Sequence, residues 1–142
     1  MPAALRRLTS DRSGNSAVEF AMVAPVLILI FAGIIGYGYI FSVYHGVQQI
    51  AAEAARAAVS GISAQERSRI ARDFVSAHAG SYAFIDPGRV SVDTRENSGG
   101  LDTFEVRIAY DMSGSVIDQI HQLVALPQPQ IARNAVIQRG GF

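Results

Sequence analysis

Apolar residues fill one long block near the beginning of the chain, and no charged side chain interrupts it. Between Glu19 and Glu53, 33 consecutive positions carry no Asp, Glu, Lys or Arg, and the core of this block, Phe20 to Phe41, has 22 residues. At ~1.5 Å per residue, a helix of that length exceeds the ~30 Å hydrocarbon core of a bilayer. Pro25 and several glycines disfavour a helix in water but are tolerated in membrane helices. The block therefore predicts one transmembrane helix.

Two other interpretations of the apolar block are disfavoured. A buried core helix of a soluble protein would need a second long apolar element to surround it, and the chain has none. A secretory signal peptide has a shorter apolar region, followed by a small-residue cleavage site. The run Ala51 to Ala58 could imitate such a site, but it contains Glu53 and Arg56 and lies too far along the chain.

Charge placement predicts how the helix is oriented. Arg6, Arg7 and Arg12 precede the block, against a single acid, Asp11. The positive-inside rule places this end in the cytoplasm and everything after Tyr44 outside. We therefore expect a single-pass protein of the inner membrane with a periplasmic C-terminal region.

The second half of the block contains two further patterns. Ala32 and Gly36 form a small-xxx-small pair, which predicts close packing against another membrane helix. Tyr37, Tyr39 and Tyr44 gather at the end of the block, where an aromatic belt would contact the lipid–water interface.

Helical periodicity continues beyond the block. Apolar residues from Val47 to Ala58 recur at helical spacing, and Gly61 marks the expected end of this helix. Ser63 and Glu66 have the spacing of a capping box, which predicts a second helix from about Ala64 to Gly80. Its arginines at positions 67, 69 and 72 are expected mostly on the solvated side.

Alternating patterns predict strands in the last third of the chain. Val90, Val92 and Thr94 alternate with polar residues, and from Thr103 to Tyr110 the inward positions are 104, 106, 108 and 110. These two segments predict a β-hairpin, to which Ile131–Arg139 adds a third strand. A short helix starting at Ser115 is expected between the hairpin and the third strand. The predicted fold class is α+β: a long transmembrane helix continuing into a periplasmic helix, a second short helix and a small antiparallel sheet.

Composition disfavours catalytic chemistry. The chain has no cysteine or lysine, and its 12 arginines balance 12 acids. Thiol, Schiff-base and P-loop chemistry are thereby excluded, and a zero net charge disfavours nucleic-acid binding. His45, His78 and His121 have no partner at metal-ligand spacing. We expect no enzyme activity, no catalytic residue, no metal site, no cofactor and no small-molecule substrate.

Glu19 is the most informative residue of the sequence. It lies at the edge of the membrane block, between Val18 and Phe20, where an unpartnered carboxylate costs a few kcal/mol. A snorkelling interfacial residue is one interpretation, and a functional carboxylate is the other. Gly14 precedes it by five positions within the segment Gly-Asn-Ser-Ala-Val-Glu-Phe, downstream of arginines.

The N-terminal region resembles TadE-like pseudopilins of the tight-adherence (Flp) pilus systems. The matching features are the basic leader, Gly14, the segment 17–21 around Glu19, Pro25 and the Ala-rich segment 51–58. In that family a prepilin peptidase cuts after the leader glycine, which implies processing between Gly14 and Asn15. Glu19 would then be the fifth residue of the mature chain. The resemblance implies that Glu19, Phe20 and Pro25 act in assembly, where the glutamate neutralises the N-terminal amine of a neighbouring subunit.

The resemblance implies a minor pilin or pseudopilin, needed to assemble a Flp/Tad adhesive pilus and thereby for cell adhesion. The expected partners are inner-membrane lipid, the prepilin peptidase, other pilins and the Tad assembly platform. We expect a leader at 1–14, a transmembrane and stalk helix at 15–61, and a periplasmic α+β domain at 62–142. The alternative is an uncleaved single-pass anchor that displays a small periplasmic binding domain.

Overall fold

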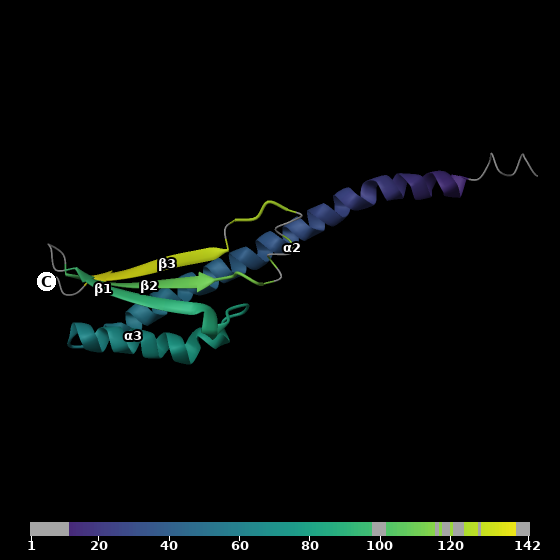
Figure 1. Ribbon diagram of the computed structural model, residues 1–142. Coiled ribbons are helices and arrows are strands. Elements are labelled where there is room, and N and C mark those ends of the chain that lie inside the picture. The colour runs from purple at the N-terminus through teal and green to yellow at the C-terminus, as the bar shows by residue number, and fades with distance from the viewer. Residues whose placement is uncertain are drawn as a thin grey trace, which may run out of the picture.

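The computed structural model describes residues 12–97, 102–115, 117, 120, 124–127 and 129–138. One long helix, α2 (Arg12–Ala58), projects from a small head that contains a second helix, α3 (Ala64–His78), and a sheet (Figure 1). Two 3-10 turns, η1 (Ala79–Ser81) and η2 (Pro87–Arg89), join α3 to the sheet. The predicted α+β class is confirmed, with its long apolar helix, second helix and small antiparallel sheet.

The helix α2 has 47 residues, about 70 Å of helix, and its two halves have different surroundings. In the first half the apolar side chains are exposed; Phe20, Met22 and Ile28, for example, are 68%, 75% and 64% exposed. The most apolar stretch of the helix contains no buried residue, and it is long and apolar enough to cross a membrane. A core helix of a soluble protein would be covered, so the exposed half indicates a single-pass membrane protein.

The second half of α2 forms the centre of the head. Its fully buried side chains follow one helical stripe: Ile40, Val43, Val47, Ile50, Ala51, Ala54, Ala55 and Ala58. The alanines at the end of this stripe allow α3 to pack closely beside α2. The long helix is thus a membrane element at one end and a core element at the other.

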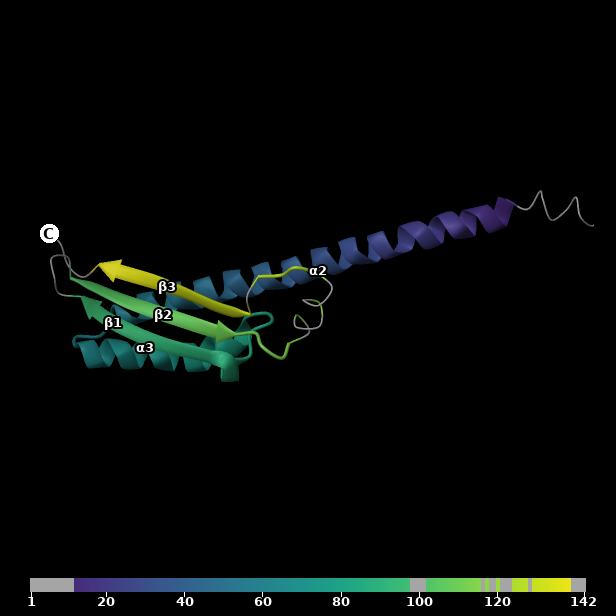
Figure 2. The same cartoon turned by 45° about the horizontal axis from the view of Figure 1, so that its top comes forward.

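The sheet consists of β1 (Val90–Asn97), β2 (Thr103–Asp111) and β3 (Gln130–Gln138), antiparallel in the order β1-β2-β3. Its inner face packs on α2 and α3, and Figure 2 shows the three strands as one layer over the helices. Phe104, Val106 and Ile108 are fully buried and Tyr110 is nearly so. The predicted inward positions of β2 are therefore confirmed.

The helix α3 begins as predicted and differs from the prediction on one face. Ser63 caps it, since its hydroxyl accepts from the backbone N–H of Glu66 at 3.2 Å. Arg67, expected on the solvated side, is instead 6% exposed. Its guanidinium donates to the carboxylate of Glu96 at 2.8 Å and to the carbonyl of Gly61 at 2.7 Å. The expectation for Arg67 was wrong because a paired arginine can occupy an inward helix position.

The connection between β2 and β3 returns along α2 toward the exposed half. Tyr37 donates its hydroxyl hydrogen to the carbonyl of Ala125 at 2.8 Å, and Leu126 is buried. The backbone N–H of Met112 donates to the carbonyl of Pro129 at 2.8 Å, which closes the base of this connection. The short helix predicted from Ser115 lies mostly outside the described residues.

Candidate functional site

The predicted processing and assembly residues lie on the exposed half of α2. Gly14, Asn15, Glu19 and Phe20 are all exposed, and α2 runs unbroken through the Gly14–Asn15 bond. Asn15 and Glu19 are one helical turn apart, and the Asn15 side-chain amide donates to Glu19 Oε1 at 2.8 Å. Among the side chains that the structure describes, no arginine or histidine forms an ion pair with Glu19. The partner that the described residues give Glu19 is thus a neutral amide.

No described side chain covers Gly14. A Cβ atom built on Gly14 meets no heavy atom within 4 Å, so a larger side chain there fits without disturbing the described chain. Gly14 is consequently not required by the local fold.

Pro25 lies inside α2, and the helix continues past it. Because proline has no backbone N–H, the carbonyl of Ala21, one turn earlier, loses its helical donor. This weakens the helix between Glu19 and the head. The structure thus places a point of reduced stiffness within the exposed half.

Ala32 and Gly36, predicted to pack against another helix, lie where α2 enters the head. Ala32 is half-buried and Gly36 is buried. A Cβ atom on Gly36 would lie 3.2 Å from Leu126 Cδ2 and 3.4 Å from Ile120 Cγ2. Gly36 therefore allows the chain's own β2–β3 connection to approach α2. Packing of this pair against a second chain stays a prediction.

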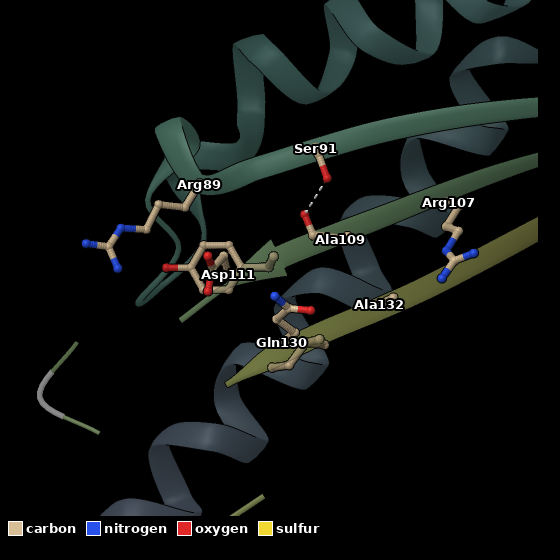
Figure 3. Close-up of a pocket in the computed structure, with 9 residues that line it drawn as sticks. Arg89, Ser91, Arg107, Ala109, Asp111, Gln130 and Ala132 are labelled. Carbon is tan, nitrogen blue, oxygen red and sulfur yellow. Dashed lines mark hydrogen bonds between the residues drawn. The ribbon is translucent and has the colours of Figure 1, made fainter. Parts of the chain in front are cut away.

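The outer face of the sheet carries a shallow hollow of about 450 Å³ (Figure 3). Its floor is a cross-strand row of small residues, Ser91, Ala109 and Ala132, which are register partners on the three strands. Arg107 lies on one rim and Arg89 on the other (Figure 3). Sequence reasoning did not find this hollow, because its residues come together only through strand pairing.

The polar groups around the hollow stabilise turns. Arg89 donates to the carbonyl of Ser113 at 2.6 Å and lies 3.6 Å from a carboxylate oxygen of Asp86. Asp111 accepts from the hydroxyl and the backbone N–H of Ser113, and these hydrogen bonds lower the pKa of its carboxyl group. The ionised Asp111 thus holds the turn after β2. The hollow offers a contact surface, with small residues below and two arginines at its edges.

A side-chain hydrogen bond also joins α2 to the loop after α3. The hydroxyl of Tyr82 donates to Glu53 Oε2 at 2.8 Å. Burial raises the pKa of Tyr82 to about 12, and the bond to the Glu53 carboxylate adds to this shift. The neutral tyrosine is therefore the form that holds the loop on the helix.

The described residues contain no group of three or more His, Asp or Glu side chains that could hold a metal ion. The functional features are an exposed apolar half-helix with one carboxylate near its start and an α+β head built around the other half. Together they define a single-pass membrane protein with a small α+β head.

Residues 14–56 match the family model described as TadE-like protein. The match begins at Gly14 and covers most of α2, so it spans less than a third of the 142-residue chain. It confirms the TadE-like resemblance of the N-terminal segment and supports an association with a Tad pilus system. No curated protein and no solved structure matches the chain.

Proposed function

We propose that the protein is a TadE-like pseudopilin or minor pilin, processed by a prepilin peptidase and needed to assemble a Flp/Tad-type adhesive pilus. In this proposal α2 anchors the precursor in the inner membrane, with the arginine-rich end in the cytoplasm and the head in the periplasm. The observation that carries the proposal is the exposed apolar half of α2 with Glu19 near its start. The TadE-like match over the same residues supports it.

The exposed half of α2 needs two successive environments under this proposal. Lipid surrounds its apolar side chains before assembly, and neighbouring pilin helices surround them afterwards. Both environments are favourable because both remove apolar surface from water. Neither environment offers a carboxylate the solvation that it has in water. Glu19 therefore favours whichever environment provides a cation.

Processing would create such a cation. Cleavage after Gly14 removes the arginines of the leader and leaves a free amine on Asn15, one helical turn from Glu19. An amine of one subunit paired with Glu19 of the next relieves both buried charges, whereas either one alone is penalised. Such a pair also fixes the axial register of neighbouring helices. The carboxylate thus acts as a selector for correct docking.

The alternative is an uncleaved anchor that displays a binding head. The hollow on the outer face of the sheet is the observation that favours it, since a partner could dock there without any processing. The two functions differ in whether the chain is cleaved after Gly14. Because no described atom lies near a Cβ at this position, a substitution there should affect cleavage without disturbing the described fold.

The first test replaces Gly14 with phenylalanine in cells that contain the prepilin peptidase. We expect the wild-type mature protein to begin at Asn15, and the variant to keep its leader, as determined by N-terminal sequencing. Gly38→Phe is a matched control, because Gly38 is also a helical glycine with open space around it. A wild-type protein that retains its leader would contradict the proposal and favour the plain anchor.

A further inference from the structure

An arginine occupies the inner, apolar face of the sheet. On β3, Ile131, Arg133 and Ala135 face the helices, whereas the residues between them are exposed. Arg133 lies at the edge of the sheet and is half-buried. A charged side chain at such a position is costly unless a partner satisfies it.

The contacts of Arg133 leave most of its donors available. Its guanidinium carbon lies 4.4 Å from the centre of the Tyr44 ring, over the ring face. One guanidinium nitrogen donates to the carbonyl of Ala132 at 3.1 Å. Within the described part of the chain no carboxylate forms an ion pair with it. Arginine carries five N–H donors, so several remain for a ligand.

The guanidinium borders a groove of about 330 Å³ between α2 and the connection before β3. The walls of this groove are mainly apolar and aromatic, and the lining residues are Tyr37, Ile40, Phe41, Tyr44, Pro127 and Arg133. Phe41 is 67% exposed and Tyr37 is 39% exposed, so the apolar side of the groove is open. The groove therefore combines one cationic end with a long apolar wall.

The position of the groove along α2 identifies its occupant. If the hydrocarbon core begins at Phe20, about 20 residues at ~1.5 Å each cross its ~30 Å and reach Tyr39. Tyr44 lies five residues further, about 8 Å beyond that boundary, which is the depth of the polar headgroup layer. Arg133 over Tyr44 is thus at phosphate depth, and Phe41 is close to the acyl chains.

We propose that this groove binds one phospholipid of the leaflet next to the head. The Arg133 guanidinium holds the lipid phosphate through charge-assisted hydrogen bonds, and the exposed side chains of Phe41 and Pro127 contact the glycerol and upper acyl chain. Tyr44 holds the guanidinium flat beneath the headgroup through its ring. The inference rests on insertion of α2 into a membrane, which is part of the proposed function, but not on processing or pilus assembly.

The test counts phospholipid retained by the full chain after purification from membranes in mild detergent, using native mass spectrometry. We expect Arg133→Gln to lower retention about tenfold, the size expected for loss of one charged hydrogen-bonding group. Arg133→Lys should retain lipid in part. Arg107→Gln is the matched control, because Arg107 is exposed on the outer face of the same sheet.

A second variant keeps the test decisive if Arg133→Gln fails to fold, as judged by circular dichroism. Phe41→Ala changes an exposed side chain of the groove wall and should lower retention while leaving the head folded. Phosphatidylglycerol added to delipidated protein should restore the bound lipid, and inorganic phosphate alone should neither bind nor compete. Equal retention by the folded Arg133 and Arg107 variants, or by Phe41→Ala and wild type, would overturn the inference, as would competition by inorganic phosphate.

The occupant and the membrane are tested separately. A photo-cross-linking phenylalanine analogue at Phe41 keeps the contact between Arg133 and Tyr44 and should capture lipid, because Phe41 lines the groove and is exposed. Capture of a second protein chain in place of lipid would refute the lipid site. Alkaline extraction of the same membranes tests insertion by itself. Release of the wild-type chain would contradict the proposed function and this inference together, whereas an inserted chain without a retained lipid would contradict this inference alone.

Discussion

Three charged side chains, Glu19, Arg67 and Arg133, occupy positions where the surrounding pattern is apolar. Arg67 is satisfied inside the head, by the carboxylate of Glu96 and the carbonyl of Gly61. Glu19 has only the neutral amide of Asn15 within the described residues, and Arg133 has a ring and one carbonyl. The head therefore satisfies its own buried charge, while the two charges near the membrane have donors or acceptors to spare. Arg67 therefore stabilises the head, whereas Glu19 and Arg133 are the charged residues to which the two proposals assign ligands.

Substitutions at the adjacent positions Val106 and Glu105 test which side chains of β2 face the core. Val106 is fully buried, so Val106→Asp places an unpaired charge in the core and should lower the free energy of unfolding by about 3 kcal/mol or more. Glu105 accepts a hydrogen bond from Asn134 on the outer face, and Glu105→Gln should change stability by less than about 0.5 kcal/mol. Urea unfolding in detergent micelles measures both. Similar losses for the two variants would refute the register.

Tyr82 predicts a loss of stability at high pH. Its pKa is about 12 in the folded chain against 10.0 for a free tyrosine, so the unfolded chain releases this proton first as the pH rises. The stabilisation from Tyr82 is complete below pH 10 and should be lost between pH 10 and about 12. Tyr82→Phe removes this contribution and leaves the other tyrosines in place. If the free energy of unfolding falls equally with pH in the two proteins over this range, Tyr82 does not titrate as proposed.

Hydrogen bonding and packing both change along α2. Pro25 removes one helical hydrogen bond in the exposed half, and from Gly36 onward one face of the helix is covered by the rest of the chain. The β2–β3 connection lies against the helix at this point, held by the bond between Tyr37 and Ala125. The head thus begins close to the end of the apolar stretch, and in the proposed membrane placement this brings the groove beside Arg133 to the membrane surface.

Gly36 and Gly38 provide a matched pair for testing this junction. A side chain on Gly36 would contact Leu126 at 3.2 Å, so Gly36→Val should overpack the junction and cost about 1–3 kcal/mol. Gly38 has no neighbour within 4 Å, so Gly38→Val should be neutral or slightly stabilising. Thermal unfolding and limited proteolysis of the connection report the difference. An equal loss of stability for the Gly38 and Gly36 variants would contradict the packing of the β2–β3 connection against α2 at Gly36.

Periodic patterns predicted the elements of this fold, and one charged residue within those patterns, Arg67, was placed on the wrong side of its helix. The alternation in β2 was read correctly because every inward position is apolar, from Phe104 to Tyr110. Arg67 was misplaced because its charge outweighed its helical spacing, although Ala71 and Val75, one and two turns later, are both buried. A buried arginine is predictable only when its partner is known, and Glu96 lies 29 residues away.

The candidate sites likewise fall into those that sequence patterns predicted and those that they did not. Gly14 and Glu19 were found from sequence because the leader, the carboxylate and the apolar block are contiguous. The hollow on the sheet and the groove at Arg133 combine residues from separate strands and from α2. Their residues are ordinary when taken singly, so only the folded chain brings them together.

The whole molecule is a rod with a head at one end, and its two ends have separate tasks. Because the head folds around the second half of α2, the proposed function predicts that the head stays intact when the first half moves from lipid into a filament. The exposed half carries Glu19 on a surface that the head does not contact. Changes at Glu19 should therefore affect assembly without affecting the stability of the head.

The most direct measurement is piliation in a strain that carries Glu19→Gln, quantified by shear fractionation. Glutamine keeps the size of the side chain and can still accept from Asn15, but it removes the charge that an N-terminal amine would pair with. We predict strongly reduced pili, with normal protein level, normal membrane insertion and normal cleavage after Gly14. Asn15→Ala, which removes only the neighbouring amide, should retain pili. Normal piliation by Glu19→Gln at normal protein level would contradict the assembly role of this carboxylate.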